Sequence, residues 1–333
     1  MYSESSALGE SEALPDVVCM GEIMVELNSV TRGPLRHVEL FEKHTAGAEG
    51  NVAIGVSRLG CSSGIISRVG NDEFGQFLLG ALRAERVDTS HVVVDGESST
   101  GLFFIQRGYP IPDKSEAFYY RTNSAGSRLN ANDVDADYIA SAKIFHITGI
   151  TPALSDSARD ATVVAVKVAE ESNVQVSLDT NVRLKLWNKE AARSILLPLC
   201  KRADIVFTSR PDSKIILGED QPEEIARILH KAGVKTVIVK LGERGAYASS
   251  SGEVATQPMI PAYVEDVTGA GDSFAAAFLA TQLKGWKLKD RLRAAATSAA
   301  LVVTVRGDYE NIPDMEGLQT ALDYERGKTE YLR

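Results

Sequence analysis

Short apolar runs rich in β-branched residues recur along this chain, with stretches of helical period between them. Buried strands are predicted at residues 17–20, 64–69, 144–148, 174–178, 205–208 and 236–239. Helices are predicted at residues 51–59, 73–84, 155–171, 189–199 and 222–232. Because buried strands that alternate with helices are typical of βαβ units, we predict an α/β fold with a mostly parallel sheet flanked by helices.

Two strand-like, aromatic stretches, 100–107 and 116–122, break this alternation. A segment with glycine and proline separates them and no helix is interposed, which predicts an antiparallel hairpin apart from the main sheet. We therefore predict a small β lid and a larger body that share one cleft. The predicted lid comprises 31–43 and 98–125, the body 16–30, 44–97 and 126–320, and the acidic, serine-rich segment 1–15 a disordered leader.

Composition limits the class of protein. The chain has 333 residues, of which 44% are hydrophobic and 24% charged, a balance typical of soluble globular proteins. Its net charge of −9, without a dense stripe of Lys and Arg, argues against nucleic-acid binding. No window approaches the roughly 20 apolar residues of a membrane span. Cys19, Cys61 and Cys200 are far apart and form no CxxC pair, so we predict neither disulfides nor a zinc site, and a cytoplasmic location.

The strongest chemical signal is the segment DVTGAGDSFA at 266–275, which leads directly into an alanine-rich helix. Backbone N–H groups of Gly269, Ala270 and Gly271 at a helix N-terminus suit an anion such as a transferring phosphoryl group. Asp272 lies inside this turn, where its carboxylate could accept a proton from a substrate hydroxyl. The simpler alternative is a tight turn with Asp272 as a helix cap.

A second glycine-rich turn, AGAEGNVA at 46–53, opens a helix near the N-terminus. Taken alone it could be a plain loop. With the downstream turn, in this order and at this separation, it resembles the two signatures of the ribokinase-like (PfkB) carbohydrate kinases, and the resemblance extends from about residue 17 to residue 313. It implies the ribokinase-like fold with a β lid, ATP and Mg²⁺ as cofactors, and a homo-oligomer.

Further blocks narrow the resemblance to the 2-keto-3-deoxygluconate kinases; they lie at 33–36, 70–75, 104–110, 119–121, 124–127, 179–187 and 305–308. This resemblance implies phosphorylation of 2-keto-3-deoxygluconate, with 2-keto-3-deoxygalactonate as a further candidate, at the 6-hydroxyl. The substrate-binding residues that it implies are Gly47, Phe103, Tyr119, Arg121, Arg183, Asp272 and Asp308. Arginine fits a substrate carboxylate because its planar guanidinium binds carboxylates bidentately.

Several of these residues have plainer interpretations, which the sequence leaves open. Each arginine could be an ordinary surface residue, Tyr119 part of the lid core, and Asp308 a loop residue that faces solvent. Phe103 stands where many relatives place a tyrosine that contacts substrate. The loss of that hydroxyl leaves selectivity between the gluconate and galactonate epimers open.

The segment VKLGERG at 239–245 resembles the strand and turn that lie beside ATP in this family. The resemblance implies nucleotide contacts from Lys240, Gly242 and Gly245, together with Gly269 and Gly271; a plain turn after a strand is the alternative. Where kinases outside this branch carry Asn-x-x-Glu, this chain has Asp212. We predict no direct protein ligand for Mg²⁺, which water and nucleotide usually hold.

Other functions remain as alternatives. The motifs GxGxxG, GxxxxGK[ST] and GxSxG are absent, which argues against dehydrogenases, Walker-type NTPases and serine hydrolases. A non-catalytic sugar-acid sensor on the same fold would not need Asp272. A fructokinase or ribokinase would bind a neutral sugar and would not need Arg121 and Arg183.

Overall fold

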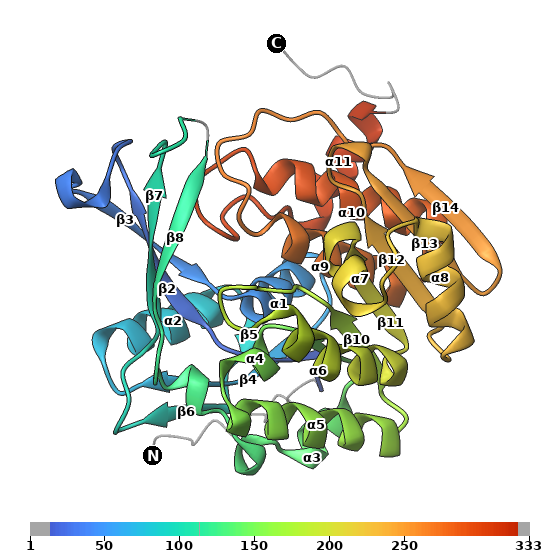
Figure 1. Ribbon diagram of the computed structural model, residues 1–333, viewed down its shortest axis with the longest axis horizontal. Helices are drawn as coiled ribbons and strands as arrows, with labels where there is room; N and C mark the ends of the chain where they lie inside the picture. The colour runs from blue at the N-terminus through green and yellow to red at the C-terminus, as the bar shows by residue number, and fades with distance from the viewer. Residues whose placement is uncertain (1–13, 113, 326–333) are drawn as a thin grey trace, which may run out of the picture.

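The computed structural model describes residues 14–112 and 114–325. The predicted leader therefore lies outside the described residues, except for its last two positions. Within the described ranges the chain forms two sheets, a large one in the body and a small one beside it (Figure 1). No helix of the described part is long and apolar enough to cross a membrane.

The large sheet has ten strands among the described residues, in the order β14-β13-β12-β11-β10-β9-β1-β4-β5, with β6 also paired to β4. Pairing is parallel from β12 to β5 and antiparallel only at β12–β13 and β13–β14. The strands are β1 Val17–Met20, β4 Ser63–Gly70, β5 Val87–Asp88, β6 Val92–Asp95, β9 Ile144–Thr148, β10 Gln175–Asp179, β11 Ile205–Ser209, β12 Thr236–Lys240, β13 Ala246–Ser250 and β14 Glu253–Gln257. The predicted α/β architecture is confirmed.

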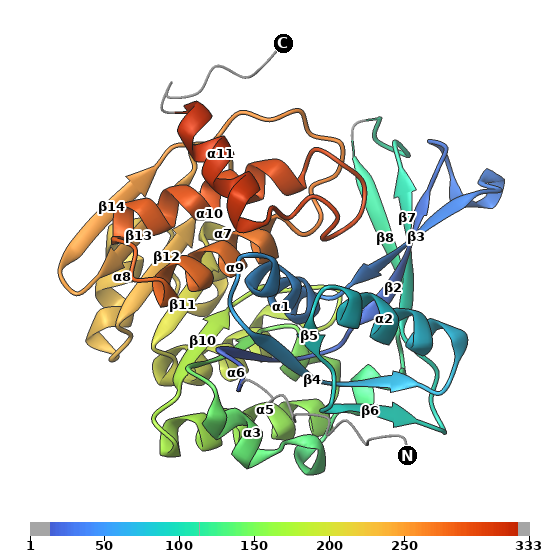
Figure 2. The ribbon, with the colours of Figure 1, turned by 180° about the vertical axis from the view of Figure 1, so that it is seen from behind.

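Helices cover both faces of this sheet, and each layer has its own apolar core. The layer in front in Figure 1 contains α5 Asp156–Glu171, α6 Lys189–Arg202, α7 Arg210–Ile216 and α8 Pro222–Lys231, with the short helices α3 Ala136–Ser141 and α4 Thr151–Leu154. The layer in front in Figure 2 contains α1 Ala48–Arg58, α2 Glu73–Ala84, α9 Ala270–Leu283, α10 Leu288–Val302 and α11 Met315–Glu325. The two glycine-rich turns open α1 and α9, which pack against each other.

The small sheet, which we call the lid, has the order β3-β2-β7-β8. Its strands are β2 Met24–Ser29, β3 Phe41–Ala46, β7 Leu102–Arg107 and β8 Ser115–Tyr120. The predicted antiparallel hairpin is confirmed as β7–β8. The lid sheet is larger than predicted, because it includes all of β2 and β3. Only three residues separate β1 from β2, and β2 pairs with β7, which is distant in sequence, so no local signal marks the change of sheet.

One face of the lid carries a row of side chains across all four strands. The register places His44 of β3 opposite Glu26 of β2, Glu26 opposite Phe103 of β7, and Phe103 opposite Tyr119 of β8. Residues opposite one another share a face of a sheet. His44 bonds Glu310, 2.5 Å away, and the charge of Asp308 acts on Glu26, so this face meets the loop that follows α10.

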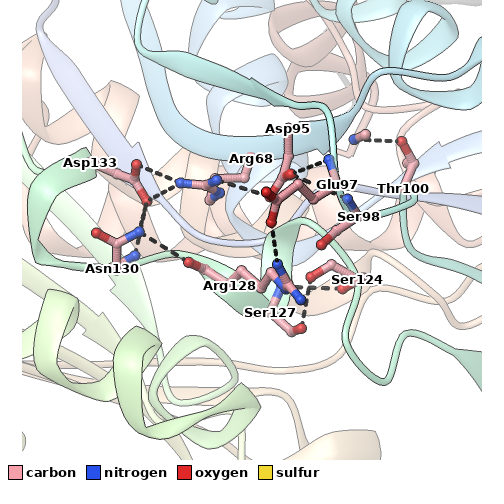
Figure 3. Close-up of polar contacts among 11 residues, drawn as sticks. Arg68, Asp95, Glu97, Ser98, Thr100, Ser124, Ser127, Arg128, Asn130 and Asp133 are labelled. Carbon is pink, nitrogen blue, oxygen red and sulfur yellow. Dashed lines mark hydrogen bonds and ion pairs between the residues drawn. The ribbon is translucent and has the colours of Figure 1, made fainter.

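Polar contacts fix the chain segments that lead into and out of the lid (Figure 3). Arg68 of β4 bonds Asp95 at 2.9 Å and Asp133 at 2.8 Å. Asp95 in turn accepts from the backbone N–H groups of Glu97 and Ser98, just before β7. The body therefore holds both connections to the lid.

Candidate active site

Asp272 lies in the first turn of α9, at the edge of the large sheet where its parallel strands end. The N-cap of α9 is Gly269, which has a left-handed conformation with φ +73°. A Cβ at Gly269 would lie 2.8 Å from the backbone carbonyl carbon of Asp308, so only glycine allows this close approach. Since Gly269 occupies the cap position, Asp272 is not the helix cap, and its carboxylate is available for other contacts.

The start of α9 has the features of an anion site. The backbone N–H groups of Ala270, Gly271 and Asp272 donate no hydrogen bond to any described residue. A Cβ at Gly271 would lie 3.4 Å from Lys240 Nζ, so an ammonium group stands beside these amides. Unpaired N–H groups, the positive end of the helix dipole and a cation together favour a phosphoryl group.

A buried asparagine connects two carboxylates in this site. Asn51, in α1, is fully buried, and its Nδ2 donates to Asp272 Oδ2 at 2.8 Å and to Asp308 Oδ2 at 3.1 Å. Asn51 belongs to the first glycine-rich motif, but its role was not predicted from the sequence. The only available signal was a polar residue in the first turn of a predicted helix, which does not identify its partners.

Burial raises the pKa of Asp272 to about 7, and the charges of Asp308 and Asp179 add to this shift. The hydrogen bond from Asn51 and the charge of Arg183 lower the pKa and limit the rise. Burial also raises the pKa of Asp308, to about 6. A carboxylate with a pKa near neutrality is well suited to general base catalysis, because it is both ionised and basic near pH 7.

Replacement of Asn51 by the isosteric leucine tests this arrangement. Because the asparagine hydrogen bond lowers the pKa of Asp272, its loss should raise that pKa and move the acidic limb of the pH profile of kcat/KM above about 7. The measurement is a pH profile of the wild type and the variant. An acidic limb at the same pH in both proteins would contradict the assigned contact.

Beyond Asp308, a buried polar chain continues into the lid. Burial and the neighbouring charge of Asp308 hold the pKa of Glu26 well above its usual range. Asn28 Nδ2 donates to Glu26 Oε1 at 2.6 Å and to Asp266 Oδ2 at 3.1 Å. Asp266 caps the turn before α9 through Thr268. The lid strand β2 is therefore linked through Asn28 to the turn before α9.

The structure gathers most of the predicted substrate residues around the lid face. Tyr119 packs on Phe103, with ring centres 5.1 Å apart, and the guanidinium of Arg121 lies 5.5 Å from the centre of the Tyr119 ring. Burial raises the pKa of Tyr119, while the charges of Arg183 and Arg121 lower it and that of Asp308 raises it further. These groups are therefore close enough to influence one another.

The two predicted arginines differ in their surroundings. Arg121 is nearly buried and forms an ion pair with Glu22, whose carboxylate accepts from Arg121 Nε at 2.7 Å and from Nη2. Arg183 is exposed and forms no ion pair with any described residue. The positive charge of Arg183 is thus uncompensated, whereas the charge of Arg121 is already neutralised within the protein.

The remaining predicted residues lie at the same edge of the large sheet. Gly47 is the N-cap of α1 with φ +126°, and a Cβ there would lie 3.0 Å from Ile23 Cα. Lys240, at the end of β12, bonds Asp179 at the end of β10, 2.5 Å away. Gly242 faces open space within its turn.

Gly245 and Asp212 have clear structural roles. Gly245 has φ +88° and lies against the backbone that follows β14, where a Cβ would be 2.6 Å from the carbonyl carbon of Pro258. Asp212 accepts from Thr180 Oγ1 at 2.8 Å and from the backbone N–H of Val182 at 3.2 Å, so it fixes the segment that leads to Arg183. No group of three or more His, Cys, Asp or Glu within the described ranges is arranged to hold a metal ion.

A base at a helix N-terminus, free amides and an adjacent ammonium form a site suited to phosphoryl transfer to a hydroxyl group. A comparison with known protein families agrees: the model of the pfkB family carbohydrate kinases matches residues 14–315. The chain belongs to the pfkB family of carbohydrate kinases.

Similar proteins of known name support this membership. A 2-dehydro-3-deoxygluconokinase of Thermoproteus tenax is 44% identical over 91% of this chain and 93% of its own length. One of Bacillus subtilis is 36% identical over 93% and 96%. Among solved structures, a putative ribokinase II of E. coli in complex with ATP and Mg²⁺ has a TM-score of 0.87 at 30% identity and covers 93% of this chain and 100% of that one.

Proposed function

We propose that this kinase transfers the γ-phosphoryl group of ATP to the 6-hydroxyl of 2-keto-3-deoxygluconate (2-dehydro-3-deoxygluconate). The observation that carries the proposal is the position of Asp272 beside the free N–H groups of α9, with Arg183 uncompensated nearby. The names of the two similar gluconokinases agree with this substrate.

In the proposed mechanism, Asp272 orients the 6-hydroxyl and accepts its proton as the oxygen attacks the γ-phosphorus. The N–H groups of Ala270, Gly271 and Asp272 stabilise the negative charge of the transferring group, as fixed donors at the site of developing charge do. Asn51 holds the Asp272 carboxylate in place from the side of α1. The lid face excludes water and so limits wasteful hydrolysis of ATP.

For the nucleotide, we propose contacts from Lys240, Gly242, Gly245 and the start of α9. The free amides and the Lys240 ammonium are what an ATP phosphate chain requires, so the residues present fit this cofactor. Mg²⁺, when bound with ATP, neutralises oxygens of the β- and γ-phosphates. We propose that nucleotide and water supply most of its ligands.

Preference for a sugar acid over a neutral sugar is proposed to come from Arg183, with Arg121 as a second donor to the carboxylate and keto oxygens. Gly47, Phe103, Tyr119 and Asp308 are proposed to line the rest of the substrate site. Because Phe103 has no hydroxyl, it cannot report a hydroxyl configuration, so we propose that 2-keto-3-deoxygalactonate is also accepted.

The reaction and its position are tested together by following ADP release and recording ³¹P NMR spectra of the product. We expect ADP formation that depends on 2-keto-3-deoxygluconate and stops when Mg²⁺ is chelated. We also expect a phosphate ester coupled to two methylene protons, as a 6-phosphate requires. A product phosphorylated on a secondary hydroxyl would contradict the proposed geometry, and sugar-acid binding without ADP release would favour a sensor.

We also propose a homo-oligomer and a cytoplasmic location. The lid edge strand β8 exposes aromatic side chains, including Phe118 and Tyr120, and a free strand edge can pair with another copy. Cys19, Cys61 and Cys200 are free, which fits a reducing compartment. Sedimentation velocity of the wild type tests the oligomer, and a monomer at micromolar concentrations would contradict it.

A further inference from the structure

Glu22 occupies the connection between the body and the lid, although no motif of the sequence drew attention to it. It lies between β1 and β2, and its side chain is 1% exposed. Its carboxylate accepts from Nε and Nη2 of Arg121 and from the hydroxyl of Ser124. Arg121 and Ser124 follow β8, so Glu22 joins one connection of the lid to another.

Two glycines, Gly101 and Gly126, lie close against the side chain of Glu22. A Cβ at Gly101 would lie 2.6 Å from Glu22 Oε1, and one at Gly126 would lie 2.8 Å from Glu22 Cβ. Gly101 directly precedes β7 and Gly126 follows β8. Glu22 is therefore enclosed by the two segments that lead into and out of the lid hairpin.

This enclosure determines which part of Arg121 a ligand can reach. The Nε and Nη2 groups of the guanidinium are taken up by Glu22. Nη1 forms no hydrogen bond with a described residue and is not fully buried. A substrate would meet one fixed N–H donor group whose charge Glu22 has already compensated.

We propose that Glu22 is a positioning residue that acts through Arg121: it holds the guanidinium so that Nη1 faces the carboxyl or keto oxygens of the sugar acid. It also leaves Arg183 as the one uncompensated cation among the predicted substrate residues. This inference rests on the proposed function. It gives the two arginines different roles. Arg183 provides an uncompensated positive charge for the substrate carboxylate, whereas Arg121 provides a hydrogen-bond donor of fixed orientation.

The test is a double-mutant cycle with Glu22→Gln, Arg121→Gln and both changes together, measured with 2-keto-3-deoxygluconate and MgATP. Glutamine retains the length of Glu22 and one acceptor oxygen for Arg121, but it has no charge and its NH2 group cannot accept the hydrogen bond from Ser124. We expect Glu22→Gln to raise KM for the sugar acid about 10-fold, as for residues of one hydrogen-bond network, with kcat little changed. The double variant should equal Arg121→Gln alone, since Glu22 has no role once Arg121 is gone.

A matched control separates positioning from a general loosening of the lid connections. Asp133→Asn removes a carboxylate that pairs with Arg68 beside the same connection but does not touch Arg121 (Figure 3). We expect this control to lower the melting temperature and to leave KM unchanged. If Arg121→Gln does not fold, the two single variants carry the test: KM should rise in Glu22→Gln and stay at the wild-type value in Asp133→Asn.

Three results would overturn the inference: additive effects of the two changes on KM, an equal rise of KM in Asp133→Asn, or a lower KM in Glu22→Gln. The last would mean that Glu22 competes with the substrate for Arg121. Failure of the proposed function looks different, because the wild type itself would then not phosphorylate 2-keto-3-deoxygluconate.

Discussion

Replacement of Asp272 by asparagine should lower kcat by about 10²- to 10⁴-fold, the usual contribution of a positioned acid or base, with little change in KM for the sugar acid. Asparagine can still accept the hydrogen bond from Asn51, so the geometry of the turn is retained. What is lost is a group that can take the proton from the 6-hydroxyl. The measurement is steady-state kinetics at saturating MgATP, with Asp160→Asn, an exposed change on α5, as the control.

The stability of this variant provides an independent check. The pKa of Asp272 determines whether the substitution raises or lowers the melting temperature. The pKa of this carboxyl is raised from 3.8 to about 7 on folding, so the unfolded chain releases its proton first. The ionised group therefore destabilises the folded protein increasingly as pH rises from about 4 to about 7. Asp272→Asn should melt at a higher temperature than the wild type at about pH 8, and the difference should vanish near pH 4.

If Asp272→Asn turned over at nearly the wild-type rate, Asp272 would not be the base. If the variant were inactive and also melted at a lower temperature at every pH, the loss of activity could be a folding defect. The expected combination is a slower but more stable protein. A gain in stability with a loss of activity is common when a buried charge needed for function is removed.

Replacement of Arg183 by alanine should raise KM for 2-keto-3-deoxygluconate by about 10- to 150-fold, the equivalent of roughly 1.5–3 kcal/mol for a hydrogen bond to a charged group. Arg183 is exposed and uncompensated, so little of the loss should come from folding. Its charge also lowers the pKa of Asp272, and its removal should raise that pKa. Kinetics at about pH 8.5, where Asp272 is ionised in both proteins, separate the two effects.

Arg193→Ala, an exposed change on α6, is the matched control for the loss of a surface arginine. We expect its KM to equal that of the wild type, and we expect KM of the wild type to rise with salt more steeply than that of Arg183→Ala. An unchanged KM in Arg183→Ala would remove this residue from the substrate site. An equal rise in KM for ATP and for the sugar acid would point instead to a disturbed site as a whole.

Much of the fold follows from local sequence signals. Ser155 was predicted to begin a helix, and the structure shows it as the N-cap of α5, where its hydroxyl accepts from the backbone of Ala158. The apolar runs at 17–20 and 144–148 are β1 and β9 with the predicted bounds. Both glycine turns open helices, and their N-caps, Gly47 and Gly269, have positive φ.

What the sequence did not predict depends on partners far away along the chain. β2 follows β1 so closely that no local signal indicates that it belongs to the lid. Its pairing with β7, which is distant in sequence, places it in the lid sheet. Asn51 gains its role only when α9 and the loop with Asp308 come to lie beside α1. Glu22 and Arg121 are 99 residues apart, and no spacing rule connects them.

The most direct test of the central claim is kcat/KM for 2-keto-3-deoxygluconate, 2-keto-3-deoxygalactonate, fructose and ribose, measured with MgATP on the wild type. A base at Asp272 opposite an uncompensated Arg183 predicts a preference for the two sugar acids of 10²-fold or more, on the order of 2.7 kcal/mol. A preference for fructose or ribose would leave the kinase and its base in place but would contradict the account of the arginines and of the substrate.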